Sequence, residues 1–169
     1  MLRLKQQWMA LLAVVALGAT APETFAHTVP YKAAGTGAYS PVTGDYSGPG
    51  LAVHFGKLSY AGNIATTPTD NPLVFDFHST VDQVNTFAKG DKLFFSLTGQ
   101  VQLIPLDPDY TTFTAIWKGE FTVTGGTGRF AGAKPADEPL KVIAVNLPFT
   151  FTDPEWFFVW EVNGEIDLP

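Results

Sequence analysis

The chain of 169 residues contains no cysteine, which excludes disulfide bridges, thiol nucleophiles and cysteine-held metals. Charged residues are sparse, at 15% of the sequence, and acidic residues outnumber basic ones by 16 to 10. This composition provides no basic stripe, so nucleic acid and anionic membranes are not expected as partners. The Gly-x-Ser-x-Gly pattern of serine hydrolases is also absent. No apolar period of 3.6 residues recurs beyond residue 26, which argues against a helical fold.

The first 26 residues have the pattern of a secretory signal peptide. Arg3 and Lys5 precede an apolar run at 9–19 that is too short to cross a bilayer. Cleavage after Ala26 is preferred to cleavage after Ala21, because a proline follows Ala21. We therefore predict a signal peptide over 1–26, a mature domain over 27–169, and a secreted or periplasmic protein with no membrane span after cleavage. Removal of the segment changes the formal net charge from −6 to −7, since it takes away two basic residues and one acidic residue.

Apolar and polar residues alternate along several segments of the mature chain. The odd positions of 73–82 and of 111–123 are mostly apolar, and the even positions are mostly polar. A period of two marks antiparallel strands with one buried face. About eight strands separated by turn residues predict an all-β fold, a single antiparallel barrel or sandwich. The expected strands cover 32–39, 50–61, 73–82, 92–104, 111–123, 140–151 and 155–162, with Asn163-Gly164 as a turn before a short last strand.

The stretch FTVTGGTGRFAGA at 121–133 contains a Gly-x-Gly-x-x-Ala pattern. A dinucleotide site would need the glycines to open a helix whose N-terminus holds the pyrophosphate. Gly132 and Pro135 leave room for about one helical turn, which is too short for that role. We therefore interpret Gly125, Gly126 and Gly128 as a structural turn and expect no cofactor.

The same stretch resembles the glycine-rich motif of allene oxide cyclases, dirigent proteins and related secreted bacterial proteins of unknown role. The segments GLAVHFG at 50–56 and KGDKL at 89–93 are similar to segments of the bacterial group. The resemblance implies a closed, eight-stranded antiparallel β-barrel with an apolar lumen, assembled as a homo-oligomer, a trimer or a dimer. The segment YKAAGTG at 31–37 lacks the glutamate that the cyclases have there. We therefore expect a non-catalytic protein that binds a small apolar molecule in the lumen or acts as an envelope or extracellular oligomeric protein.

Four aromatic residues of the alternating segments are candidates for the ligand-binding wall. They are Phe75, Phe77, Phe113 and Trp117. All four occupy the apolar phase of their segments, so they are expected to share one face of the sheet.

The alternative function is an isomerase, cyclase or dirigent-like enzyme that acts on a hydrophobic substrate in the lumen. His54, Asp76 and His78 are its candidate catalytic residues, since a carboxylate can orient an imidazole as a general base. A hairpin centred near Thr66 would place His54 opposite His78, with Asp76 on the same face. Two histidines and a carboxylate could also hold a metal, although no metal is expected in the preferred interpretation.

A second alternative is a copper-binding protein. Cleavage after Ala26 would make His27 the N-terminal residue, with its amine and its ring nitrogen both available. Such an arrangement resembles the copper brace of polysaccharide oxygenases. The second imidazole would come from His54 or His78.

Overall fold

The computed structural model describes residues 27–169 and shows a chain built from β-strands joined by turns. The signal peptide predicted for 1–26 lies outside the described residues. A single 3-10 turn, η1 (Gly128–Phe130), follows the seventh strand. The strands are β1 (His27–Tyr39), β2 (Asp45–Ala52), β3 (Gly56–Pro68), β4 (Val74–Ser79), β5 (Gln83–Phe87), β6 (Lys92–Pro105), β7 (Phe113–Thr127), β8 (Lys134–Pro135), β9 (Leu140–Asn146) and β10 (Trp156–Leu168).

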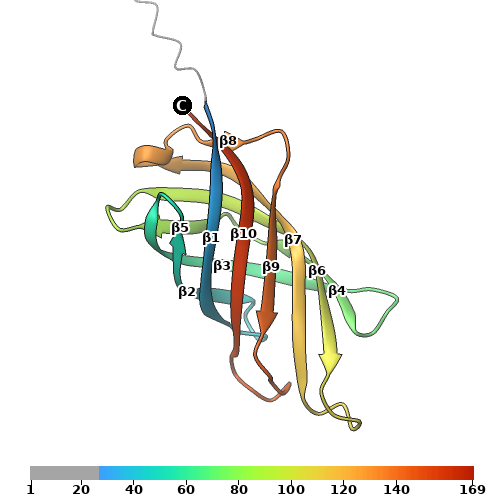
Figure 1. Ribbon diagram of the computed structural model, residues 1–169. Coiled ribbons are helices and arrows are strands. Elements are labelled where there is room, and N and C mark those ends of the chain that lie inside the picture. The colour runs from blue at the N-terminus through green and yellow to red at the C-terminus, as the bar shows by residue number, and fades with distance from the viewer. Residues whose placement is uncertain (1–26) are drawn as a thin grey trace, which may run out of the picture.

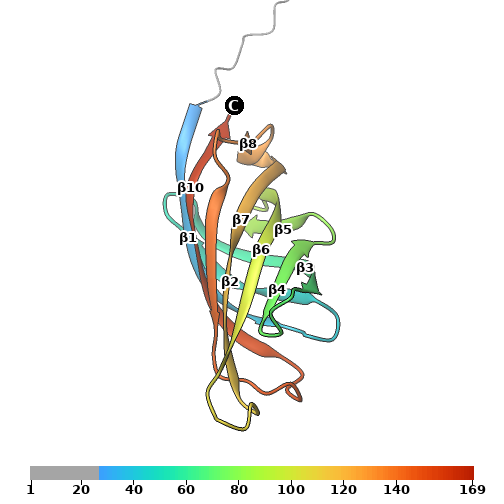
Figure 2. The same cartoon turned by 90° about the vertical axis from the view of Figure 1, so that its right-hand side faces the viewer.

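Eight antiparallel strands form a closed ring in the order β1-β2-β3-β4-β6-β7-β9-β10. The ring closes where β10 pairs with β1 along the whole of β1, from His27 opposite Leu168 to Tyr39 opposite Trp156. Figures 1 and 2 show β1, β10 and β9 running side by side, with β3 crossing behind them. Closure leaves no long unpaired edge on this apolar sheet. The predicted all-β class and antiparallel pairing are confirmed.

Two places in the ring are each filled by two short strands in line. β5 continues β4 between β3 and β6, after a break at 80–82. β8 and β9 both pair with β10, on either side of a break at 136–139. The small strands therefore extend the eight-membered ring and do not add members to it.

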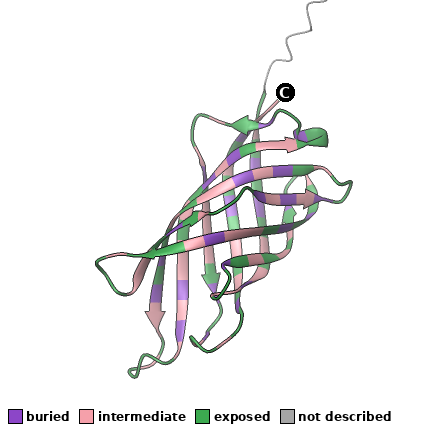
Figure 3. Cartoon of the chain, turned by 180° about the vertical axis from the view of Figure 1, so that it is seen from behind, coloured by how far each residue is buried: buried purple, intermediate pink, exposed green. Residues whose placement is uncertain are grey.

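Buried and more exposed residues alternate along the strands (Figure 3), because successive side chains point to opposite faces of the sheet. In β7, Phe113, Ala115 and Phe121 are buried inside, whereas Lys118 and Glu120 are exposed outside. The buried side chains form two clusters. The first cluster consists of Tyr31, Ala33, Ala52, Leu58, Tyr60, Phe87, Leu93, Phe95, Phe121, Val123, Phe130, Ala133, Leu140, Val162 and Ile166. The second cluster consists of Tyr39, Ile64, Val101, Leu103, Phe113, Ala115, Phe149 and Trp156.

Inward glycines make room for aromatic rings. A ring of eight strands has an interior only wide enough for side chains or one small ligand, so large residues need small ones beside them. Phe77, for example, lies over two paired glycines, Gly99 and Gly119; a Cβ on either would be 2.9 Å from Cζ of Phe77. The directly opposed pairs are Gly35 and Trp160, Gly37 and Phe158, Gly164 and Tyr31, Gly48 and Tyr60, Gly62 and Tyr46, and Gly99 and Phe77.

Two sequence predictions about strands are wrong. The expected strand 50–61 is interrupted by a turn at 53–55, where His54 adopts a φ of 67°. The expected turn at Asn163-Gly164 does not occur, because β10 continues through both residues. Gly164 lies opposite Tyr31, and a Cβ there would be 2.9 Å from Leu140, so this glycine provides space and does not reverse the chain.

Asp107 organises the loop between β6 and β7. Its carboxylate accepts hydrogen bonds from the backbone N–H groups of Asp109 (3.1 Å), Thr111 (3.0 Å) and Thr112 (2.6 Å), and from the Thr111 hydroxyl (3.0 Å). These bonds, the one from the Thr111 N–H first, lower the pKa of Asp107 to about 2.

We expect the Asp107 carboxyl to titrate with a midpoint of about 2 in carbon-detected NMR, against an ordinary value of 3.8. Because the folded-state pKa is lowered, the stabilisation is present above about pH 4 and is lost as the pH falls through 2. The melting temperatures of the wild type and Asp107→Asn should therefore converge on acidification through this range. Asp109→Asn serves as the control. A difference that stays constant down to pH 2 would contradict the assignment.

Candidate functional site

A cavity of about 90 Å³ lies inside the ring, lined by members of both clusters. All eight strands of the ring contribute to its wall, and the accessible wall consists of apolar atoms only. Enclosed apolar cavities in proteins stay dry and take up small apolar molecules. The lining residues are Tyr39, Tyr46, Tyr60, Ile64, Phe77, Phe95, Leu97, Trp117, Phe121, Val142, Ala144, Phe158, Trp160 and Val162.

Aromatic contacts hold the wall in place. The rings of Phe95 and Phe121 stack with centroids 3.9 Å apart. Trp117 meets Phe77 edge-on at 5.3 Å, and its indole N–H donates to Oδ1 of buried Asn146 at 2.6 Å. Offset and edge-on arrangements are the favoured geometries of aromatic pairs. The wall is therefore packed in defined positions around the cavity.

The tyrosines of the wall are neutral. The hydroxyl of Tyr60 donates to the Thr36 carbonyl at 2.8 Å. Desolvation by burial raises the pKa of Tyr60 and of Tyr46 above the ordinary value of 10.0, and the nearby Tyr60 raises that of Tyr46 further. No carboxylate, imidazole or ammonium group is among the lining residues. The cavity can hold a molecule, but it presents no group that titrates near neutral pH.

Two of the four predicted ligand-binding residues line the cavity, and the other two do not. Phe77 and Trp117 line the cavity. Phe113 is buried in the second cluster, where its ring lies parallel to Phe149 with centroids 6.3 Å apart, and Phe75 packs against the same cluster. Phe113 lies four residues before Trp117 on β7 and forms a bridge with Phe149, and Phe75 lies two residues before Phe77 on β4. Both side chains therefore pack in the second cluster beyond the cavity wall.

The alternation pattern of the sequence does not identify several residues of the cavity wall. Tyr46, Tyr60, Phe158 and Trp160 lie on β2, β3 and β10. In the segment 156–162 both phases of the alternation are apolar, so periodicity could not tell the inner face from the outer one. The usable signal is a glycine opposite each aromatic residue, and it becomes visible only once the strand register is known.

The prediction that His54 lies opposite His78 is wrong. Ala65 is the β3 partner of His78, and His54 lies in the turn before β3. The β3–β4 hairpin turns at 69–73, not near Thr66. There the Asn71 side chain accepts a hydrogen bond from the Leu73 N–H at 3.0 Å, a short-range contact that stabilises the turn.

The candidate proton-transfer residues lie away from the cavity. His54, Asp76 and His78 are exposed, and Asp76 accepts a hydrogen bond from the Gln100 side chain at 2.9 Å on the outer face. His27 is exposed at the start of β1. Within residues 27–169, no three His, Asp or Glu side chains are placed to hold a metal ion. The cleavage that would make His27 N-terminal concerns residues outside the described part of the chain.

The glycine-rich stretch joins a strand end to a tight turn. Gly125 and Gly126 still belong to β7, opposite Phe94 and Leu93, after a β-bulge that shifts the register. Gly128 opens the turn η1 with a φ of 61°. A Cβ on Gly126 would be 2.5 Å from Cβ of Phe130, so this glycine lets Phe130 fold back into the first cluster, where it is fully buried.

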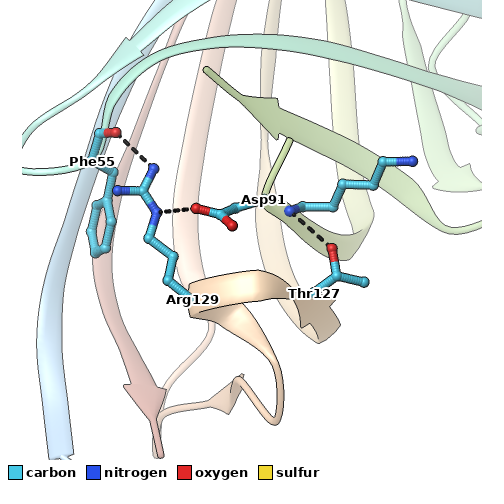
Figure 4. Close-up of polar contacts among 5 residues, drawn as sticks. Phe55, Asp91, Thr127 and Arg129 are labelled. Carbon is cyan, nitrogen blue, oxygen red and sulfur yellow. Dashed lines mark hydrogen bonds and ion pairs between the residues drawn. The ribbon is translucent and has the colours of Figure 1, made fainter. Parts of the chain in front are cut away.

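Arg129 contacts several segments of the chain around the glycine-rich turn (Figure 4). Its guanidinium forms an ion pair with Asp91 at 3.2 Å and donates to the Phe55 carbonyl at 2.8 Å. It also lies over the rings of Phe55, Phe87 and Phe130, at 4.9–5.4 Å from their centroids. The stretch is followed by one 3-10 turn and no longer helix, so it lacks the helix that a dinucleotide site requires.

Comparison of the chain with protein-family models, with curated proteins and with solved structures finds no match. Among the described residues, no helix has the length and apolar character needed to cross a membrane.

Proposed function

We propose that the protein is a non-catalytic binding protein whose ring of strands is a small barrel of the allene-oxide-cyclase or dirigent type. Its ligand is one small, wholly apolar molecule held in the internal cavity. The observation that supports this proposal is the 90 Å³ cavity, lined by residues of all eight strands and walled by apolar atoms. Apolar cavities of about 150 Å³ take up benzene or xenon, so a ligand of this size class or slightly smaller is appropriate.

Binding without reaction agrees with the chemistry of the wall. A ligand would gain about 25 cal/mol for each Å² of apolar surface removed from water. Among the lining residues, the Tyr46 hydroxyl and the Trp160 indole N–H are buried without a hydrogen-bond partner. A polar group on the ligand that reached neither of them would lose its water at a cost of about 1–3 kcal/mol. Tyr46 and Tyr60 stay protonated, and His54, Asp76 and His78 do not line the cavity. The wall therefore favours apolar molecules over polar ones that reach neither the Tyr46 hydroxyl nor the Trp160 indole N–H.

We further propose that the protein is secreted or periplasmic and forms a homo-oligomer. The pattern of residues 1–26 supports export. On the outer face, Val145 of β9 lies directly opposite Val159 of β10, and both are exposed. Phe157, on the same face of β10, is 57% exposed. Exposed apolar residues grouped in this way are typical of contacts between subunits.

The proposal is tested by titrating the purified protein with benzene and with xenon in ¹H–¹⁵N NMR. We expect saturable shifts of the Trp117 and Trp160 indole signals, because both rings line the cavity. Ala144→Leu adds three carbon atoms to the wall and should abolish these shifts.

The matched control is Ala61→Leu. It is the same change at a β3 residue whose exposed side chain lies on the outer face of the ring. It should leave the titration unaltered. Equal shifts in Ala144→Leu and Ala61→Leu would place the binding outside the cavity, and no shift in the wild type would contradict the proposal.

A further inference from the structure

Two neighbouring loops form an apolar surface at one end of the ring. They connect β6 to β7 (106–112) and β9 to β10 (147–155), and Figures 1 and 2 show them together at the lower end; we call this surface the two-loop end. Four large hydrophobic residues on it are exposed: Leu106 (51%), Tyr110 (60%), Leu147 (53%) and Phe151 (58%). Exposed aromatic residues grouped in this way are typical of binding surfaces.

The charge of the two-loop end is entirely acidic. The loops carry Asp107, Asp109, Asp153 and Glu155 and no basic residue. No lysine, arginine or histidine occurs anywhere in 93–117 or in 142–169, the segments that contain both loops and much of their flanking strands. The surface therefore attracts cations, with nothing of opposite sign in these segments to neutralise it.

The four carboxylates differ in how free they are to contact a binding partner. Asp107 accepts the hydrogen bonds that organise its own loop, and Asp153 accepts one from the Thr150 N–H at 2.6 Å. Asp109 and Glu155 are exposed, and their carboxylates form no ion pair and accept no hydrogen bond from the rest of residues 27–169. These two side chains are free to contact a partner.

Contacts with the end of the ring restrict both loops, and such restriction lowers the entropic cost of binding. Phe113 and Phe149 form a β-bridge between them. The ring of Phe151 lies 4.8 Å from that of Phe113 and 5.8 Å from that of Trp156. Three prolines further restrict the backbone; they are Pro108, Pro148 and Pro154.

We propose that the two-loop end docks a basic polypeptide segment in which arginine or lysine alternates with apolar residues. Tyr110 and Phe151 would contact the apolar side chains and the faces of the guanidinium groups. Asp109 and Glu155 would pair with the positive charges. A second copy of this chain fits less well, because symmetric docking of this end would bring acidic groups together.

The test uses a fluorescein-labelled heptapeptide of alternating Arg and Leu, and a second peptide with Glu in place of Arg. Fluorescence anisotropy with the purified protein should show binding of the Arg peptide at least about tenfold tighter than the Glu peptide, weakening as salt rises. Phe151→Ser and Tyr110→Ser should each weaken binding by about tenfold. The double variant Asp109→Asn, Glu155→Gln should lose most of the salt dependence.

Val81→Ser is the matched control, since Val81 is 60% exposed in the break between β4 and β5, outside the two loops. It should bind the Arg peptide as the wild type does. Equal binding of both peptides, or equal weakening by Val81→Ser and Phe151→Ser, would overturn the proposal. So would sedimentation showing a dimer that Phe151→Ser dissociates, because the end would then bind a second copy. If a loop variant unfolds by circular dichroism, Leu106→Ser replaces it in the same comparison.

Discussion

Replacing Gly99 by alanine is expected to destabilise the protein by about 3 kcal/mol or more. A Cβ at this position would lie 2.2 Å from the Lys118 carbonyl oxygen and 2.5 Å from Cα of Gly119, in addition to its contact with Phe77. The two nearest atoms belong to the backbone of β7, which cannot yield without separating β6 from β7. Urea unfolding followed by tryptophan fluorescence measures the loss.

The same substitution at Gly90 is the control. Gly90 has no atom within 4 Å of an added Cβ, but its φ of 82° makes alanine unfavourable by about 1–2 kcal/mol. Gly99→Ala should therefore cost clearly more than Gly90→Ala. Removing Phe77 as the third contact, in the background Phe77→Leu, should not restore stability. Equal losses at Gly99 and Gly90 would show that β6 and β7 do not approach as closely as described.

Phe130→Ala is expected to destabilise the protein by about 3–5 kcal/mol, since it removes a fully buried aromatic ring from the first cluster. The ring lies 4.8 Å from Phe87 and 5.3 Å from Phe55, and the guanidinium of Arg129 covers all three. Its loss would leave the end of the ring open to water. Differential scanning calorimetry of the variant reports the change.

Phe151→Ala is the matched comparison, because this phenylalanine is 58% exposed. It should cost about 1–2 kcal/mol, clearly less than Phe130→Ala, because its ring contacts Phe113 and Trp156 but is more than half exposed. Two variants of similar stability would mean that the glycine-rich turn does not anchor Phe130 in the core.

The alternation of residue types predicts the strands and their buried faces well where only one phase is apolar. In 111–123 the apolar odd positions are the ones that face inward in β7. The glycine-rich stretch is also interpretable as a turn, because Gly132 and Pro135 leave room for only about one helical turn after it. In both cases the information is local, so neighbouring residues in the sequence contain it.

Strand register and the positions of turns cannot be predicted from local sequence in the same way. The sequence predicts a β3–β4 hairpin centred near Thr66, but the chain turns at 69–73, so His54 does not lie opposite His78. The Asn163-Gly164 pair predicts a turn, but Gly164 provides room for Tyr31 on the neighbouring strand β1. A glycine selected for space and a glycine selected for a positive φ look identical in a sequence, and only the neighbour across the strand distinguishes them.

The sequence by itself determined the secondary-structure class, the acidic character and the absence of thiol chemistry, because these depend on composition and on local alternation. Only the tertiary structure decided that the sheet closes, that Phe77 and Trp117 share a cavity with Tyr46, Tyr60 and Trp160, and that Phe75 and Phe113 do not. A cavity is the space left after residues from all eight strands have packed. Its position therefore depends on pairings between residues far apart in the chain, which no local pattern records.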